Sequence, residues 1–281
     1  MHKKILCLAL AALLLLCGCA KAETVPSAPV VVTTMPLLEI TSRLLRGSDV
    51  PAPVSVISEP VSCLHDYTLS VEQMQRIAGA ELLITSGLGL EDFMLDALSA
   101  SEAAVIDASV GVTPLVSDGG SDPHIWLAPE NAAIMAENIA DGLSEKYPQA
   151  AAKIAKNLTA YLAETTELQA YGEQTLNALP CRELITFHDG GSYLADAFGL
   201  TVAAAMEIEP GSEPSAKELE AIIELVRTHA IPAVFVEKNG TTDAAELVSR
   251  ETGAKVYTLD MGFSGGDFIR NNIDTVKEAL Q

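Results

Sequence analysis

An apolar helical pattern runs from Gln149 to Leu179 with hardly a break, and it constrains the fold more than any other stretch of the chain. It contains one internal glycine, Gly172, and no proline after Pro148. Thirty residues of α-helix measure about 45 Å, which is the breadth of a domain or more. We therefore predict a helix shared by two lobes rather than a connection inside one lobe.

Strand-like and helix-like segments alternate on both sides of this pattern, which is typical of parallel βα units rather than of a β-sandwich. We predict an α/β fold in which two parallel-sheet lobes, residues 30–147 and 181–281, are joined by a long rigid linking helix within 148–180. The expected strands are 30–34, 53–58, 81–86, 104–107, 183–187, 201–206, 233–236 and 255–259. The expected helices are 36–45, 70–80, 91–98, 131–143, 193–198, 214–228, 243–252 and 268–280, and 117–121 is expected to be a flexible loop.

The first residues have the pattern of an export signal. A basic pair, Lys3-Lys4, precedes an apolar run that is too short to span a bilayer comfortably as a permanent helix. We interpret residues 1–18 as a signal peptide and residues 19–29, which are small, polar and proline-bearing, as a tether. The ending Leu-Cys-Gly-Cys resembles the lipobox of bacterial lipoproteins, which implies cleavage before Cys19 and acylation of its thiol. A plain signal peptide with a chance cysteine is the alternative.

The formal net charge of −21 excludes some classes of partner. Such a surface repels nucleic acid and anionic headgroups, so we expect no nucleic-acid partner. Two cysteines remain in the body of the chain, Cys63 and Cys181. Export permits a disulfide, but the two residues lie in different predicted lobes, and we expect free, buried thiols.

Three histidines and one aspartate occupy comparable places in the two halves. His65 and His124 precede helical patterns in the first half, whereas His188 and Asp260 follow strand-like runs in the second. Ligands of open α/β sheets bind at the carboxyl ends of the strands. If the lobes face each other, the four side chains meet in the cleft between them, and three imidazoles with one carboxylate suit tetrahedral Zn²⁺. For His124 the alternative is an ordinary loop with Trp126 as a core anchor.

Three other charged or titratable residues lie near the predicted ligands or resemble them. Asp260 has a simpler alternative role, because an aspartate at that place can cap a turn. His229 lies late in a predicted helix, where a cation is favoured, and we leave it out of the site. Glu237 ends a predicted strand and points toward the cleft, so we expect a supporting group or an exposed carboxylate rather than a ligand.

Several motifs carry a resemblance to a known family. The chain resembles the metal-binding substrate-binding proteins that serve ABC importers of zinc and manganese, from about residue 30 to residue 280. The resemblance implies that His124 and His188 are metal ligands, that Asp260 is the carboxylate ligand, and that the long helix is the rigid interlobe backbone. The motifs are Asp122-Pro123-His124-Ile125-Trp126-Leu127, Phe187-His188-Asp189, Tyr193-Leu194-Ala195, Gly199-Leu200 and Glu213-Pro214-Ser215.

The chain also departs from the family pattern. The family usually has Asp-Pro-His at the first ligand, whereas His65 here follows Cys63-Leu64, so Cys63 could approach the site. Ala128 replaces an aspartate often found after the tryptophan, which implies that a carboxylate partner of His124 is absent. Residues 116–121 contain no histidine, unlike the capture loop of some zinc importers. Some manganese-selective relatives have glutamate in place of His188, so a histidine there favours zinc, with Mn²⁺ as the alternative.

The function that we expect is capture of Zn²⁺ outside the cytoplasm and its delivery to an ABC permease, by a lipid-anchored monomer. Metal binding should involve small shifts rather than wide closure, and affinity should fall below about pH 6.5, because an imidazole must be neutral to bind metal. The alternatives are a manganese-binding homologue and an adhesin-like surface lipoprotein with a structural metal. A zinc hydrolase is disfavoured, because four protein ligands leave no open position.

Overall fold

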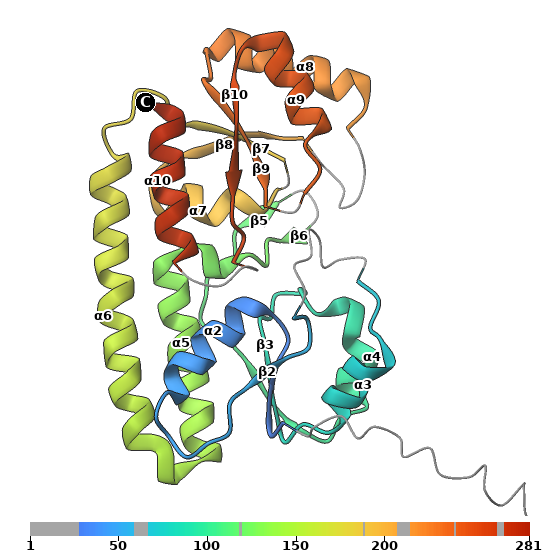
Figure 1. Ribbon diagram of the computed structural model, residues 1–281, viewed down its shortest axis with the longest axis vertical. Helices are drawn as coiled ribbons and strands as arrows, with labels where there is room; N and C mark the ends of the chain where they lie inside the picture. The colour runs from blue at the N-terminus through green and yellow to red at the C-terminus, as the bar shows by residue number, and fades with distance from the viewer. Residues whose placement is uncertain are drawn as a thin grey trace, which may run out of the picture.

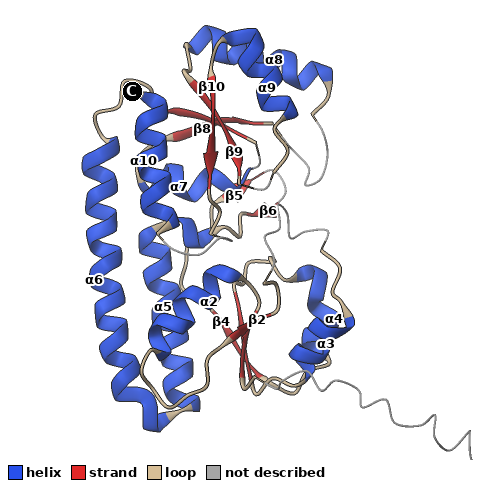
Figure 2. Ribbon diagram, in the orientation of Figure 1, coloured by secondary structure: helices blue, strands red, loops and turns tan. Residues whose placement is uncertain are grey.

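The computed structural model describes residues 28–58, 67–117, 120–187, 189–206, 214–238, 240–262 and 267–281. Within them lie two four-stranded sheets in which every pairing is parallel (Figures 1 and 2). The first has the order β2-β1-β3-β4 and the second β10-β9-β7-β8. The strands are β1 Val30–Val32, β2 Val54–Ser55, β3 Leu82–Thr85, β4 Ala104–Asp107, β7 Glu183–Thr186, β8 Thr201–Ala205, β9 Ala233–Glu237 and β10 Lys255–Leu259. The predicted pair of parallel-sheet lobes is confirmed.

Helices follow most of the strands, as expected for βα units. Two of them begin with a capping box, at Ser70 with Gln73 and at Ser215 with Glu218, so the sequence sets these boundaries through side-chain hydrogen bonds. The α-helices are α2 Met35–Leu45, α3 Val71–Ala78, α4 Leu95–Ser99, α5 Pro129–Lys146, α6 Ala151–Leu176, α7 Ser192–Ala197, α8 Ala216–His229, α9 Asp243–Thr252 and α10 Phe268–Leu280. The 3₁₀ turns are η1 Asp92–Met94, η2 Ile125–Leu127, η3 Pro148–Ala150 and η4 Asp189–Gly191.

The long helix predicted between the lobes is α6, which has 26 residues and lies within the predicted linking segment. It packs along α5 and contacts both α2 of the first lobe and α10 of the second (Figure 1). At Gly172 a Cβ atom would lie 2.1 Å from the Phe198 ring, so the glycine lets that ring rest against the helix backbone. The boundaries predicted for the signal, tether and lobes stay predictions, and Cys19 lies outside the described residues.

A continuous apolar core joins the two lobes through α6. It extends from Val31 and Leu83 in the first sheet, through Ile154 and Leu176 of α6, to Leu184 in the second sheet. A separate cluster fills the other side of the second sheet, beneath α8 and α9. Because a wide rotation of one lobe would expose part of the shared core to water, the packing favours small adjustments between the lobes.

The segment expected to be a flexible loop differs from the prediction. β5 Val116–Ser117 pairs with β6 Gly120–Ser121 in an antiparallel hairpin. Gly120 has φ of 130°, a conformation that favours glycine. The turn-forming residues of this segment suggested a loop, but its two ends are close enough for the backbone to form ladder hydrogen bonds.

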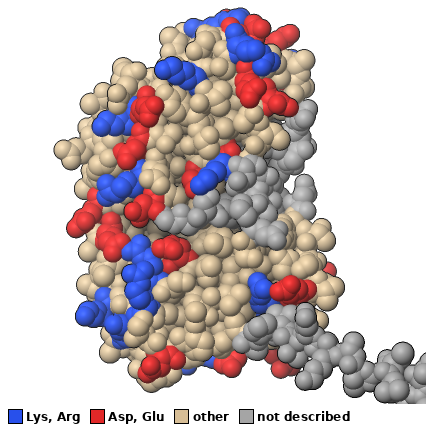
Figure 3. All heavy atoms as spheres, in the orientation of Figure 1, with Lys and Arg blue, Asp and Glu red and all other residues tan. Residues whose placement is uncertain are grey.

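Charged side chains are distributed without one dominant sign on the face shown in Figure 3. Acidic and basic side chains lie side by side along the left edge of this face, and several basic side chains adjoin one another at its lower left.

A buried glutamate fastens the two central strands of the first sheet at their carboxyl ends. Glu91 Oε1 accepts hydrogen bonds from Thr33 Oγ1 at 2.6 Å and from the Ser86 amide at 2.7 Å, and Oε2 accepts one from the Gly87 amide at 3.0 Å. Thr33 follows β1, whereas Ser86 and Gly87 follow β3. Burial raises the pKa of Glu91 above its ordinary value, because the loss of hydration outweighs these three hydrogen bonds.

Replacement of Glu91 should change how stability depends on pH. Because its pKa is raised, the folded chain binds a proton at Glu91 more readily than the unfolded chain. Proton binding at Glu91 therefore stabilises the folded chain, and this stabilisation is complete below the unfolded pKa of about 4.3. It is lost as pH rises through the folded pKa, and between the two pKa values the unfolding free energy falls by about 1.4 kcal/mol per pH unit. The unfolding free energy of the wild type minus that of Glu91→Gln should therefore fall with pH in this range. Urea denaturation at several pH values measures it, and a difference that rises with pH would contradict the assignment.

Candidate metal centre

His124 is held in place by the aspartate two residues before it. It precedes η2, and its half-buried imidazole Nδ1 lies 2.8 Å from Asp122 Oδ1. The same oxygen accepts a hydrogen bond from the His124 amide at 2.9 Å. A histidine whose Nδ1 donates to a carboxylate presents Nε2 to a metal and has its ring orientation fixed. The Asp122 carboxylate therefore fixes the His124 ring in a way that would suit metal binding, and the role of His124 as a ligand stays a prediction.

This geometry corrects the expectation that a carboxylate partner of His124 is absent. Ala128 does stand where relatives often have an aspartate, and it is a buried N-cap of α5 without a carboxylate. Asp122 supplies the missing group from the other side. Its side chain is 3% exposed, so the oxygen that contacts His124 is shielded from water and the hydrogen bond is stronger than one at the surface.

A tyrosine from the second lobe supports the same segment. Tyr193 of α7 donates its hydroxyl hydrogen to the Asp122 carbonyl oxygen at 3.0 Å and accepts a hydrogen bond from the Leu115 amide at 3.0 Å. Its ring is buried, and burial raises the pKa of the phenol, which therefore stays protonated and able to donate. The loop that carries His124 is thus positioned by both lobes.

Asp260 directly follows β10 in the second lobe. Its backbone is fixed by the buried side chain of Asn272, which accepts from the Asp260 amide and donates to its carbonyl oxygen, both at 2.8 Å. Oδ1 accepts a hydrogen bond from the Gly262 amide at 2.9 Å, so the alternative role as a turn cap is present as well. Oδ2 lies 3.2 Å from the ammonium of Lys238. One oxygen orients the carboxylate and the other meets a cation.

Trp126 connects the His124 and Asp260 segments across the two lobes. Its ring centroid lies 5.4 Å from that of His124, and its indole Nε1 donates to the carbonyl oxygen of Met261 at 2.8 Å. Met261 is the residue after Asp260, so a buried hydrogen bond spans the two predicted ligand segments. Trp126 is 1% exposed and is also the core anchor of the alternative interpretation. Both roles are present in one residue.

The other two predicted ligands, His65 and His188, lie outside the described residues, as does Cys63. Over the ranges that the structure does describe, no group of three or more His, Cys, Asp or Glu side chains is placed to hold a metal. Glu237, at the end of β9, is half-buried and lines a narrow cavity with Thr186, Phe187 and Met261. The structure thus brings together the surroundings of His124 and Asp260, and the complete set of four stays a prediction.

His229 and Cys181 both lie among the described residues. His229, the last residue of α8, pairs with the carboxylate of Glu183 at 2.8 Å, so its position outside the site has a local explanation. Cys181 is a free thiol, as expected, but it is half-buried rather than buried, and it lies 3.7 Å from the Glu183 carbonyl oxygen.

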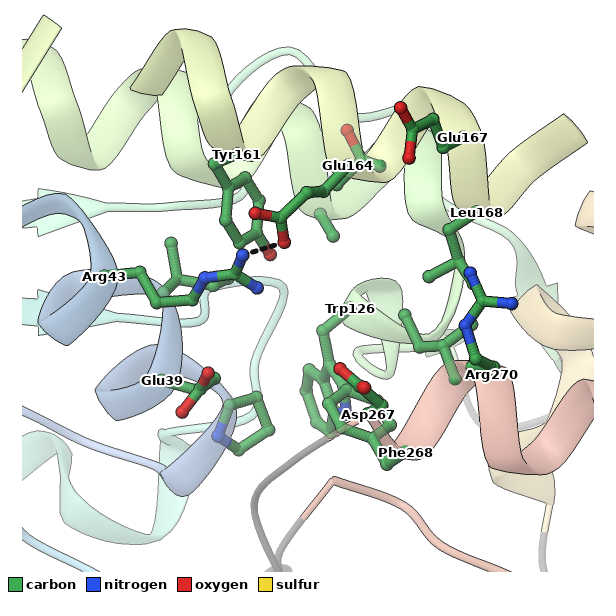
Figure 4. Close-up of a pocket in the computed structure, with 15 residues that line it drawn as sticks. Glu39, Arg43, Trp126, Tyr161, Glu164, Glu167, Leu168, Asp267, Phe268 and Arg270 are labelled. Carbon is green, nitrogen blue, oxygen red and sulfur yellow. Dashed lines mark hydrogen bonds and ion pairs between the residues drawn. The ribbon is translucent and has the colours of Figure 1, made fainter. Parts of the chain in front are cut away.

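A larger cavity lies on another side of Trp126, where α2, α6 and α10 meet (Figure 4). It measures about 220 Å³. Arg43 forms an ion pair with Glu164 and stacks on Tyr161, which ties α2 to α6 at its edge. Its lining contains carboxylates but no histidine or cysteine, and it is not a cluster suited to a metal. Trp126 therefore separates this seam between the helices from the His124 side.

Residues 30–279 match the family described as ZnuA, the periplasmic component A of a zinc-uptake complex. The chain belongs to this family. Among relatives, the high-affinity zinc uptake system protein ZnuA of Haemophilus ducreyi is 28% identical over 269 residues, which are 84% of this chain and 86% of that protein. The manganese-binding lipoprotein MntA of Halalkalibacterium halodurans is 26% identical over 267 residues, or 89% and 88% of the two chains. A crystal structure of ZnuA superposes with a TM-score of 0.81 at 28% identity, covering 91% of this chain and all of that one.

Membership of the ZnuA family confirms the resemblance drawn from the motifs. The family consists of metal-binding substrate-binding proteins of ABC uptake systems, so the class of protein is that of a transport component acting outside the cytoplasm. Among the described residues, none of the helices is both long enough and apolar enough to cross a bilayer.

Sequence reasoning missed four supporting residues around the two ligand segments. The role of Asp122 could have been predicted, because the side chain of an aspartate can accept a hydrogen bond from the backbone amide two residues later. At that position it also lies close to the ring of a histidine. The contacts of the other three residues depend on tertiary register, and no local pattern specifies them: Tyr193, Lys238 and Asn272.

Proposed function

We propose that this protein captures Zn²⁺ outside the cytoplasm and delivers it to the permease of an ABC importer, with Mn²⁺ as the alternative cargo. The observation that carries the proposal is the buried Asp122–His124 pair, which Trp126 ties to the segment of Asp260. Family membership supports the same function. His65, His124, His188 and Asp260 would hold the ion as a set of three nitrogens and one oxygen, which suits zinc in tetrahedral geometry.

The same ligand set argues against an enzyme. Four protein ligands fill a tetrahedral zinc ion and leave no position for a water nucleophile. We therefore propose a binding protein without catalytic activity. A hydrolysable ester turned over by the zinc-loaded chain, and not by the metal-free chain, would contradict this.

The proposal includes a membrane anchor. Residues 1–18 would be removed, Cys19 would be acylated, and residues 19–29 would tether a monomeric body near the permease. The name of the MntA relative, a lipoprotein, supports this arrangement. Mass spectrometry of the chain extracted from membranes should find the acyl mass on Cys19, and an unmodified Cys19 would contradict the anchor.

Zinc titration of the metal-stripped protein tests the function. We expect calorimetry to show one saturable zinc ion per chain, and circular dichroism to show that the metal-free chain stays folded, because the shared core, over the described residues, consists of apolar side chains and includes none of the four proposed ligands. Unfolding on addition of a chelator would favour the structural metal of an adhesin-like lipoprotein. The absence of saturable zinc binding would count decisively against the proposal. A second titration with Mn²⁺ distinguishes the two cargoes, because the cargo should bind more tightly.

A further inference from the structure

Lys238 and Asp260 are neighbours because of the strand register in the second sheet. β9 and β10 run parallel with Glu237 opposite Leu259, so the next residue of each strand lies at the same sheet edge. The Lys238 amide continues the ladder by donating to the Leu259 carbonyl oxygen at 2.9 Å. The side-chain ammonium then lies 3.2 Å from Asp260 Oδ2. The fold itself places a cation against a predicted metal ligand.

The two oxygens of Asp260 have different partners. Oδ1 accepts a hydrogen bond from the Gly262 amide, which a bound metal would not need to disturb. Oδ2 has the Lys238 ammonium as its only partner among the described residues. The backbone of Asp260 is held by Asn272 on both sides of the residue. Oδ2 is therefore the oxygen left to bind an ion, and Lys238 occupies it.

We propose that Lys238 is a tethered competitor of the metal. In the metal-free protein its ammonium neutralises Asp260, and the incoming dication must displace it toward water. The side chain can leave, because it is 52% exposed whereas that of Asp260 is 16% exposed. Once displaced, the ammonium stays on the neighbouring strand end, ready to return when the ion departs. This inference rests on the proposed function, and it adds a residue that weakens binding and speeds release.

The expected size of the effect is modest. An ion pair with an exposed lysine is weak, and its loss alone changes an equilibrium by a factor of about 5 at most. Repulsion between the displaced ammonium and the bound dication adds to this, although water and salt screen it. Removal of the charge should therefore tighten zinc binding about three- to tenfold. Release of zinc should slow by a comparable factor, because affinity differences between related complexes lie mostly in the dissociation rate.

Three variants separate this effect from a general change in charge. Lys238→Gln removes the ammonium, and Lys238→Arg keeps a cation at the same place. Lys255→Gln is the matched control, because Lys255 is an exposed residue at the opposite end of β10 and its replacement changes the net charge equally. Zinc affinity is measured by competition with a chelator, and release by mixing the loaded protein with excess chelator, each at low and high salt.

The proposal predicts tighter zinc binding and slower zinc release for Lys238→Gln. Lys238→Arg and Lys255→Gln should have affinities and release rates close to those of the wild type. The difference in affinity between Lys238→Gln and the wild type should become smaller as salt is raised. Lys238→Gln with the affinity of Lys255→Gln, or with weaker binding, would overturn it. A result that overturns the role of Lys238 does not contradict the transport function, because all four chains would still bind zinc. The function itself fails only if the wild type binds none. Thermal unfolding of each metal-free variant shows that the fold is retained.

Discussion

Replacement of His124 by alanine should lower the affinity for zinc by at least about 100-fold. The change removes one of four proposed ligands, and mutation of a mere supporting partner of a ligand already costs 10- to 100-fold. The fold should survive, since the Asp122 carbonyl still accepts the Tyr193 hydroxyl and Trp126 still bonds to Met261. Calorimetry or chelator competition on the metal-stripped protein provides the measurement.

His229→Ala is the matched control for this experiment. His229 is also a partly exposed histidine paired with a carboxylate, that of Glu183, but it lies at the end of α8 and outside the site. Its replacement should leave zinc affinity unchanged. If His124→Ala bound zinc as tightly as the wild type, the proposal that His124 is a zinc ligand would be wrong.

Replacement of Trp126 by alanine should destabilise the metal-free protein by about 3–5 kcal/mol. The side chain is fully buried, so its loss leaves a large cavity next to the space shown in Figure 4. It also removes the hydrogen bond to the Met261 carbonyl oxygen, which joins the lobes beside the site. Urea denaturation followed by far-ultraviolet circular dichroism measures the change, because the variant has no tryptophan fluorescence.

Two further variants sharpen the test of Trp126. Trp126→Phe keeps most of the packing but loses the indole N–H, so it should be destabilised by about 1–3 kcal/mol as the Met261 carbonyl loses its buried donor. Val71→Ala changes an apolar residue that is 66% exposed and should alter stability by no more than about 0.5 kcal/mol. If Trp126→Ala behaved like Val71→Ala, the central place given to the tryptophan would be wrong.

Much of the fold could be predicted because its signals are local. The 3.6-residue period from Gln149 to Leu179 predicted α6, whose observed bounds are Ala151–Leu176. The helix predicted over 70–80 is α3, and the capping box of Ser70 with Gln73 sets its start through residues three apart in sequence. Such features depend on neighbours in sequence, so a single chain is enough to find them. The β5–β6 hairpin was missed because its turn residues are equally typical of an irregular loop.

The surroundings of the candidate site were harder to predict, because they depend on register between distant segments. His124 was predicted from its place before a helical pattern and Asp260 from its place after a strand-like run, and both stay predictions as ligands. The bond from Trp126 to Met261 links residues 135 positions apart, and the Lys238–Asp260 pair exists only because Glu237 lies opposite Leu259. No sequence pattern specifies either contact. His65 and His188, which were predicted with the same reasoning, lie outside the described residues.

The apolar core that runs from one sheet through α6 to the other affects how tightly an ion can be held. Folding has already brought the two halves of the protein to their working separation, so the entropy of bringing them together is not lost when the ion arrives. Such preorganisation raises affinity without any added contact. A protein that collects metal at scarce concentrations would gain most from this, because a higher affinity fills its site at a lower concentration of free ion.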